Sequence, residues 1–130
     1  MKTIEEVRKL FEGDRFATQN GAVIEEIGDH SATCSLSVTD LHRNAMGAVM
    51  GGTYFMLADF AFAVAANNDK MGCVSLHSDI SFLCPAKGNK LTAKAVCIKE
   101  GRSTSCYRVD VTDDFGNLTA TVTVTGYHVV

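Results

Sequence analysis

Residues 51–67 read GGTYFMLADFAFAVAAN, and this stretch decides the fold. Good helix formers and aromatic side chains occupy nearly its whole circumference, so the pattern predicts a helix over about 51–66 that is apolar on all sides. Asp59 interrupts the apolar run, which is also shorter than the ~20 residues that a membrane span needs. We therefore expect a buried central helix that other parts of the structure wrap.

Segments of alternating apolar and polar residues flank this helix on both sides. Residues 22–27 and 32–38 precede it, and the turn at 28–30 between them makes a β-hairpin the expected structure. Four segments after the helix predict antiparallel strands with one buried face: 75–83, 91–99, 103–112 and 118–128.

Thr3 and Glu6 match a capping box and predict a short amphipathic helix at the N-terminus. Together with the central helix and the strands, this indicates an α+β fold in which an antiparallel meander curls around one long helix. The open edges of such a sheet, and a helix that is apolar on all sides, both favour at least a homodimer.

Length and composition exclude several classes of protein. The 130 residues suffice for one domain, 1–130, and are 46% hydrophobic and 21% charged. The net charge of -3 gives no general attraction to nucleic acid or to an anionic membrane. The N-terminal residues lack the apolar core of a secretory signal, which favours a cytoplasmic location. Five widely spaced cysteines favour reduced thiols, and no histidine spacing is typical of a metal site, so no metal is expected.

Asp59 is the first candidate catalytic residue. A lone carboxylate among apolar neighbours costs several kcal/mol unless it is paired, hydrogen-bonded or protonated. Asp59 is therefore either a general base or nucleophile with an adjusted pKa, or a carboxylate that meets solvent at a crevice or pairs with a buried Arg or Lys.

Gly51 and Gly52 begin the central helix, where amides without a Cβ beside them suit a developing oxyanion. A tight entry turn is the alternative reason for two glycines. Gly51 lies eight residues from Asp59, about 12 Å along a helix axis, so one helix cannot bring both to one carbonyl. If both act, the carboxylate comes from one subunit and the amide from the other.

The polar loop before the helix contains Asn44, which either orients a water or an acyl carbonyl, or caps its own backbone. We expect the neighbouring His42 and Arg43 to be solvated. Two turns, 85–90 and 99–103, carry two cations each that suit phosphate groups, although charged hairpin tips are also common.

Residues 44–67 together, N-A-M-G-A-V-M-G-G-T-Y-F-M-L-A-D-F-A-F-A-V-A-A-N, resemble the signature of PaaI-like hotdog-fold acyl-CoA thioesterases. That signature is N-x-x-G-x-x-H-G-G-x-x-x-x-L-A-D, followed by an alanine-rich helix that ends in Asn. The resemblance continues through 80–88, 99–103 and the closing D-x-x-G-N-L-T-A hairpin. It implies a sheet wrapped around the helix 51–66 and a dimer with two sites at its interface, often within a homotetramer.

The resemblance also implies roles for individual residues. Asp59 is the nucleophile or water-activating base, Gly51 supplies the oxyanion amide, Asn44 positions the carbonyl or the water, and Ser75 assists in some members. Two segments hold pantetheine and the CoA nucleotide: Phe82, Leu83, Cys84, Pro85, Ala86 and Lys87 in the first, and Lys99, Gly101, Arg102, Ser103 and Thr104 in the second. Coenzyme A is part of the substrate, so no cofactor is expected.

Met50 departs from this signature, which has the histidine of H-G-G at that position. A thioether cannot donate a hydrogen bond or carry a charge. Two functions therefore remain open: hydrolysis of a small or aromatic acyl-CoA thioester, and binding of acyl-CoA by a non-catalytic hotdog module.

Overall fold

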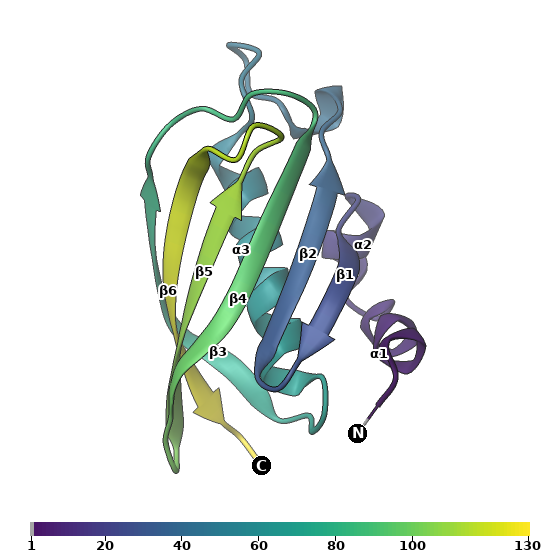
Figure 1. Cartoon of the computed structure of the whole chain (residues 1–130), viewed down its shortest axis with the longest axis vertical. Coiled ribbons are helices and arrows are strands. Elements are labelled where there is room, and N and C mark those ends of the chain that lie inside the picture. The colour runs from purple at the N-terminus through teal and green to yellow at the C-terminus, as the bar shows by residue number, and fades with distance from the viewer. Residues whose placement is uncertain (1) are drawn as a thin grey trace.

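The computed structural model describes residues 2–130, and its helices and strands follow the order that Figure 1 traces by colour. The elements are α1 (Ile4–Phe11), α2 (Arg15–Gln19), β1 (Val23–Gly28), β2 (Ser31–Ser37), the short 3-10 helix η1 (Asp40–His42), α3 (Gly51–Asn67), β3 (Cys73–Phe82), β4 (Lys90–Glu100), β5 (Thr104–Thr112) and β6 (Leu118–His128). Within these residues, no helix is long and apolar enough to cross a membrane.

The six strands form one antiparallel sheet in the order β1-β2-β4-β5-β6-β3. In Figure 1 this sheet lies in front of α3, which confirms the expected α+β arrangement. The predicted meander is correct for β4, β5 and β6, but β3 pairs with β6 and not with β4. The connection 83–89 crosses the end of the sheet to reach β4, and the Leu83 N–H donates to Thr119 O on the way.

The core lies between α3 and the inward face of the sheet. Side chains alternate along β5 and β6, and the fully buried inward residues include Val109, Val111, Val122 and Val124. From the helix side, the ring of Phe62 meets Tyr107 edge to face at a centroid distance of 5.2 Å. The sheet does not wrap α3 completely, because Gly52 and Asp59 are exposed and the intervening Met56 is only half-buried. These residues lie at helical spacing and form one uncovered stripe.

The N-terminal helix forms as expected, since Thr3 and Glu6 make the reciprocal hydrogen bonds of a capping box. Phe11 packs edge to face on Phe60 of α3. The Arg8 guanidinium donates twice to the Ile24 carbonyl, where β1 contains a bulge. The β1 edge of the sheet is therefore covered by α1. The second short helix, α2, was not expected from the sequence.

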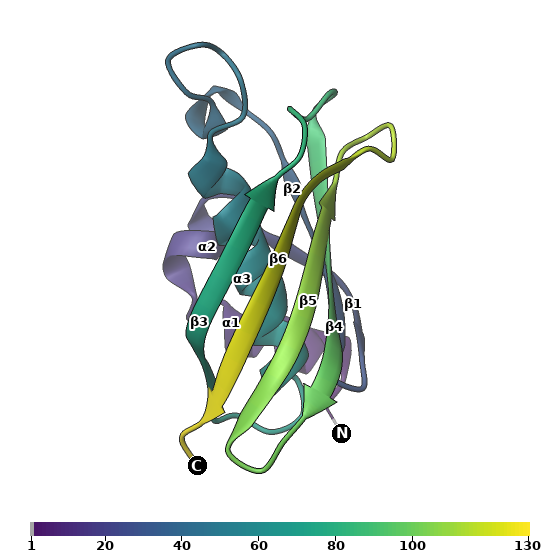
Figure 2. The same ribbon diagram turned by 90° about the vertical axis from the view of Figure 1, so that its left-hand side faces the viewer.

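The opposite edge of the sheet, β3, is open. Figure 2 shows β3 at the edge beside β6, with α3 behind the strands. Along its ten residues Cys73 alone is buried, and apolar side chains such as Val74 and Leu76 are exposed. The alternation that predicted one buried face therefore does not describe β3 within a single chain. A long edge strand without a cover is a surface on which another strand can pair.

Candidate active site

The first turn of α3 presents an amide with no acceptor. Gly51 is the first residue of the helix, and no group within residues 2–130 accepts a hydrogen bond from its N–H. The loop before it is held by His42, whose carbonyl accepts from the Met50 N–H and the Thr53 hydroxyl. The prediction that His42 is solvated is wrong: it is buried, and its Nε2 lies 2.6 Å from the Asn20 carbonyl oxygen.

A cavity of about 380 Å³, here called the Gly51 cavity, opens at this helix end. Its lining residues are Ala48, Val49, Gly51, Tyr54, Phe82, Leu83, Cys84 and Pro85. A Cβ on Gly51 would lie 3.1 Å from Cζ of Phe82, so glycine permits the close approach of this ring. The structure thus brings four of the predicted pantetheine-binding residues to the predicted oxyanion amide.

Tyr54 holds the wall of the Gly51 cavity in place. Its ring packs edge to face against Phe82 at 6.1 Å, and its hydroxyl accepts a hydrogen bond from the Ala86 N–H at 2.9 Å. One helical turn beyond Gly51, the buried Tyr54 therefore fixes the segment 82–86 above the start of α3. Sequence analysis missed this residue, although a tyrosine hydroxyl in an otherwise apolar helix is a signal that a polar partner exists.

Asp113 fixes the following residues of the same connection. Its carboxylate accepts hydrogen bonds from the backbone N–H groups of Lys87, Phe115 and Asn117. Although burial acts in the opposite direction, these bonds and one from the Asn117 side chain lower the pKa of Asp113 to about 2. The Lys87 backbone is thus anchored, while its side chain remains exposed.

Asn44 lies in the exposed loop before α3. Its Oδ1 accepts from the backbone N–H groups of Met46 and Ala48, so the side chain caps its own loop, one of the two alternatives that the sequence left open. It does not line the Gly51 cavity. Ser75 is exposed on the edge strand β3, opposite Gly126 of β6, and lines none of the cavities described here.

Asp59 lines a separate cavity of about 320 Å³, here called the Asp59 cavity. The other lining residues are Asp14, Arg15, Phe16, Ala17, Met56 and Phe60. Asp59 is exposed, and no hydrogen bond or ion pair to its carboxylate is found within residues 2–130. The carboxylate faces a crevice between α3 and α2, which is one of the alternatives that the sequence left open for Asp59.

The surroundings of Asp59 raise the proton affinity of its carboxylate. Partial removal of water by the apolar lining raises the pKa of Asp59, and the negative charge of Asp14 raises it further. The residue as a whole is exposed, so the effect comes from the immediate surroundings of the carboxyl group and not from burial of the side chain in the core. A more basic carboxylate suits a general base.

Met50 contacts the first turn of α3 from the other side. A Cβ on Gly52 would lie 2.8 Å from the Met50 methyl carbon, so the thioether folds over that glycine. Met50 lines a small cavity of about 160 Å³, which shares Phe16 and Met56 with the Asp59 cavity. The side chain at position 50 thus faces the apolar groove that contains Asp59, and not the Gly51 cavity.

The second predicted CoA-binding segment lies at the opposite end of α3. Gly101 and Arg102 line a cavity of about 290 Å³, here called the Glu100 cavity, together with Ala66 and Lys70 from the helix end. Lys99, Ser103 and Thr104 do not line it. Within one chain, the two predicted CoA-binding segments are therefore apart, because Gly51 and Ala66 are separated by about 22 Å of helix.

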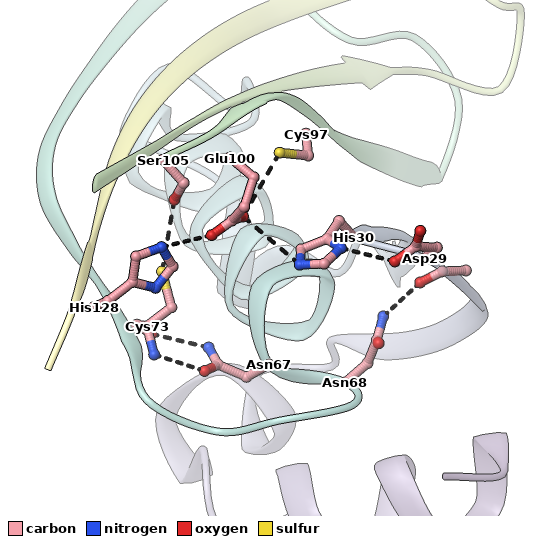
Figure 3. A network of polar contacts seen from close by, with 10 residues as sticks. Asp29, His30, Asn67, Asn68, Cys73, Cys97, Glu100, Ser105 and His128 are labelled. Carbon is pink, nitrogen blue, oxygen red and sulfur yellow. Dashed lines mark hydrogen bonds and ion pairs between the residues drawn. The ribbon is translucent and has the colours of Figure 1, made fainter. Parts of the chain in front are cut away.

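Figure 3 shows the polar network beside this cavity, with Glu100 between His30 and His128. The Glu100 carboxylate lies 2.5 Å from Nε2 of His128 and 3.6 Å from Nε2 of His30. The His128 contact is a close approach and not a well-aligned hydrogen bond. Asn67 ends α3 here, since its side chain bonds the Gly72 and Cys73 backbone. Within residues 2–130, no group of three or more His, Cys, Asp or Glu has the geometry to hold a metal ion.

Comparison with known proteins agrees with this geometry. The family model described as Thioesterase superfamily matches residues 46–120. Acyl-coenzyme A thioesterase PaaI of Escherichia coli is 31% identical over 111 residues, which are 85% of this chain and 79% of that protein. The solved structure of E. coli PaaI has a TM-score of 0.89 at 27% identity, over 94% of this chain and 89% of the other.

A hypothetical thioesterase from Streptococcus pneumoniae, solved with coenzyme A, is also similar. It has a TM-score of 0.83 at 25% identity and covers 91% of this chain and 95% of its own. The family match spans both the helix with its two glycines and the strands that carry the cationic turns. The chain therefore belongs to the thioesterase superfamily and has the PaaI-like hotdog fold.

Proposed function

We propose that this protein hydrolyses acyl-CoA thioesters at a site that two copies of the chain build together. One copy supplies the Gly51 amide, and the other supplies the Asp59 carboxylate. The observation that carries the proposal is that α3 presents an unused amide and an unpaired carboxylate in two separate cavities, about 12 Å apart along one helix axis. A base and an oxyanion donor that act on one carbonyl each need to lie about 3 Å from the reacting atoms.

The open strand β3 supports a two-fold dimer, because two copies can pair their β3 edges antiparallel and continue the sheet. The two α3 helices then run antiparallel side by side. If Gly51 of one helix is level with the partner's Asp59, the half-buried Phe55 lies at the two-fold axis. The same register brings the partner's Glu100 cavity toward the loop that precedes α3. The cationic turn and the Gly51 cavity thus come from different copies.

In this arrangement the Gly51 N–H binds the thioester oxygen, at the positive end of the α3 dipole. The Asp59 carboxylate either attacks the carbonyl carbon or removes a proton from the water that attacks it. If Asp59 removes a proton from the attacking water, the C–S bond then breaks and CoA leaves as the thiol with that proton. If Asp59 attacks the carbonyl itself, the C–S bond breaks to leave an acyl-Asp59 anhydride and a CoA thiolate, which takes a proton from solvent. Water then hydrolyses the anhydride, which releases the free acid and restores the carboxylate. The raised pKa of Asp59 makes its carboxylate a stronger base for this step.

The acyl group is proposed to be small or aromatic. The Asp59 cavity has a limited volume of about 320 Å³ and is lined by the rings of Phe16 and Phe60. The aromatic and aliphatic part of this lining favours a compact apolar acyl group. The CoA phosphates are assigned to the cations Arg102 and Lys70 at the Glu100 cavity, and to Lys99 on the same turn.

Steady-state hydrolysis of a panel of acyl-CoAs tests the activity. The panel compares acetyl-, butyryl-, octanoyl-, benzoyl- and phenylacetyl-CoA, with release of free thiol as the readout. We expect the highest kcat/KM for a small or aromatic acyl group. Asp59→Asn keeps the shape of the side chain but removes the basic oxygen, so kcat should fall by at least ~100-fold. Near-normal turnover by this variant would exclude Asp59 from the chemistry.

A mixing experiment tests whether the site is shared. Gly51→Pro removes the N–H at the first helical position, where the backbone accommodates proline. Gly51→Ala is the matched control, because its added Cβ also contacts Phe82 while the N–H remains. We expect the Asp59→Asn and Gly51→Pro chains each to be nearly inactive alone. After exchange in a 1:1 mixture, mixed dimers contain one intact site, so about a quarter of wild-type activity should return. Confirmed mixed dimers that remain inactive would refute the shared site.

Met50 supports a second candidate function, a non-catalytic module that binds acyl-CoA. Its thioether folds over Gly52, has no hydrogen bond within residues 2–130, and replaces the histidine of the family signature. This alternative predicts that CoA esters bind, as measured by calorimetry, but that no member of the panel is hydrolysed faster than in buffer. The acyl-CoA panel therefore separates the two functions directly.

A further inference from the structure

The Asp59 cavity holds a second carboxylate that no step of the proposed reaction uses. Asp14 lies at the junction of α1 and α2 and lines this cavity together with Asp59. It occupies the N-cap position of α2, yet its side chain makes no capping hydrogen bond. It also makes no ion pair within residues 2–130. Its side chain therefore makes no specific contact with the helix that it precedes or with a neighbouring cation, and it shares the cavity with Asp59.

We propose that Asp14 is a positioning residue of the candidate active site, which acts on the thioester through Asp59 by its negative charge. The proposal rests on the proposed function, in which Asp59 is the base or nucleophile. It adds a residue from the N-terminal segment that the family signature over residues 44–67 does not contain. It also gives the α1–α2 segment a function beyond covering the helix.

The charged groups around Asp59 can be named from each element packed against it. On α3 itself, Asp59 is the sole charged residue. From α2, Arg15 lines the same cavity but forms no ion pair with either carboxylate. From α1, Arg8 and Glu12 line a different cavity of about 200 Å³ that also includes Phe60. Of these charged groups, Asp14 is the one whose charge raises the pKa of Asp59, and it lines the same cavity.

The physical effect follows from the repulsion between like charges. Partial desolvation of the carboxyl group is the larger cause of the raised pKa of Asp59, and the Asp14 carboxylate adds to it because a second negative charge in one cavity is unfavourable. The higher proton affinity makes ionised Asp59 a stronger base toward the attacking water. Loss of the Asp14 charge thus weakens the base and moves its ionisation to lower pH.

Asp14→Asn tests the proposal through the pH dependence of kcat/KM on the best acyl-CoA of the panel. We expect the acidic limb to move down by about half a pH unit, and kcat on the plateau to fall about twofold. Asp14→Glu, which keeps the charge, should leave the limb close to that of wild type. Glu26→Gln is the matched control, since it removes one exposed carboxylate that lines none of these cavities.

Salt provides a readout that a purely structural role would not affect. Raising ionic strength to 1 M screens the Asp14 charge and should move the wild-type limb toward that of Asp14→Asn, while the variant moves much less. A lower kcat with an unmoved limb would assign Asp14 a structural role and overturn the proposal. Equal shifts in Asp14→Asn and Glu26→Gln would also overturn it, because the effect would then be one of net charge.

Carboxyl titration by ¹³C NMR separates failure of this proposal from failure of the proposed function. The Asp59 signal is identified by its loss in Asp59→Asn, and its midpoint is compared in wild type and Asp14→Asn. If no acyl-CoA is hydrolysed, the proposed function fails, and the midpoint still reports whether Asp14 acts on Asp59. An unchanged midpoint refutes the proposal whatever the activity.

Discussion

Tyr54→Phe tests how the Gly51 cavity is held together. The change deletes one oxygen, the acceptor of the 2.9 Å hydrogen bond from the Ala86 N–H. Tyr54 is 4% exposed, so the lost partner is not simply replaced by water at the helix surface. The packing of the ring on Phe82 remains, which limits the change to the hydrogen bond.

The expected magnitude follows from this single bond. A hydrogen bond of this kind contributes about 1 kcal/mol, and an amide left without a partner brings the loss to about 2 kcal/mol. For 130 residues, 1 kcal/mol corresponds to roughly 4 °C, so Tm should fall by about 4–8 °C. Because the segment 82–86 forms a wall of the cavity, KM for acyl-CoA should rise by about twofold to fivefold with little change in kcat.

Differential scanning calorimetry and steady-state kinetics measure both effects. Tyr127→Phe is the matched control, because it makes the same chemical change at an exposed tyrosine whose hydroxyl has no hydrogen bond within residues 2–130. The reasoning is refuted if Tyr54→Phe and Tyr127→Phe have the same Tm and the same KM. A lower Tm with unchanged KM would retain the stabilising role but exclude the segment 82–86 from substrate binding.

Three further predictions concern charge and the departure from the family signature. The pKa of Asp113 is lower in the folded chain than in the unfolded one, so its contribution to stability is present above about pH 4 and is lost as the pH falls toward about 2. Asp113→Asn should therefore lower Tm at pH 7 and weaken the dependence of Tm on pH between 4 and 2; a parallel pH profile would contradict this. Lys99→Ala combined with Arg102→Ala should raise KM for acyl-CoA roughly tenfold with little change in kcat, because these cations hold ground and transition states alike; an unchanged KM in steady-state assays would place the phosphates elsewhere. Met50→His should change kcat by less than about threefold, since the loop before α3 is already fixed by hydrogen bonds that do not use the Met50 side chain; a tenfold rise in the same assays would show that an imidazole at this position takes part in the reaction.

The elements that could be predicted from the sequence are those whose pattern is local and long. The helix 51–67 follows from its composition, and β5 and β6 follow from strict alternation with one buried face. The helix α2 has five residues, which is too short for any periodicity to appear. The position of β3 beside β6 depends on a crossing that the backbone of residue 119 and the side chain of Asp113 fix over a long sequence distance.

The same difference between local patterns and long-range contacts explains which residues of the candidate site could be predicted. Gly51 could be placed because helix starts leave amides unpaired wherever they occur. His42 was misjudged because its partner, the Asn20 carbonyl, lies 22 residues away. The surroundings of Asp59 could not be inferred from α3, since Phe16 and Asp14 belong to a segment with no helical signal of its own.

Asp59 also shows why an apolar pattern around a helix does not determine what covers it. The sheet covers most of α3, but the stripe through Gly52, Met56 and Asp59 is not covered by the sheet. Residues of α2 lie beside this stripe and form cavities with it. In a monomer, the half-buried Met56 of this stripe leaves apolar surface in water. In the proposed dimer the same stripe lies beside the partner's Gly51, so the surface that the fold leaves open is the surface where the substrate binds. In this proposal, dimer formation both covers the exposed part of α3 and completes the catalytic site, and the mixing experiment tests the shared site.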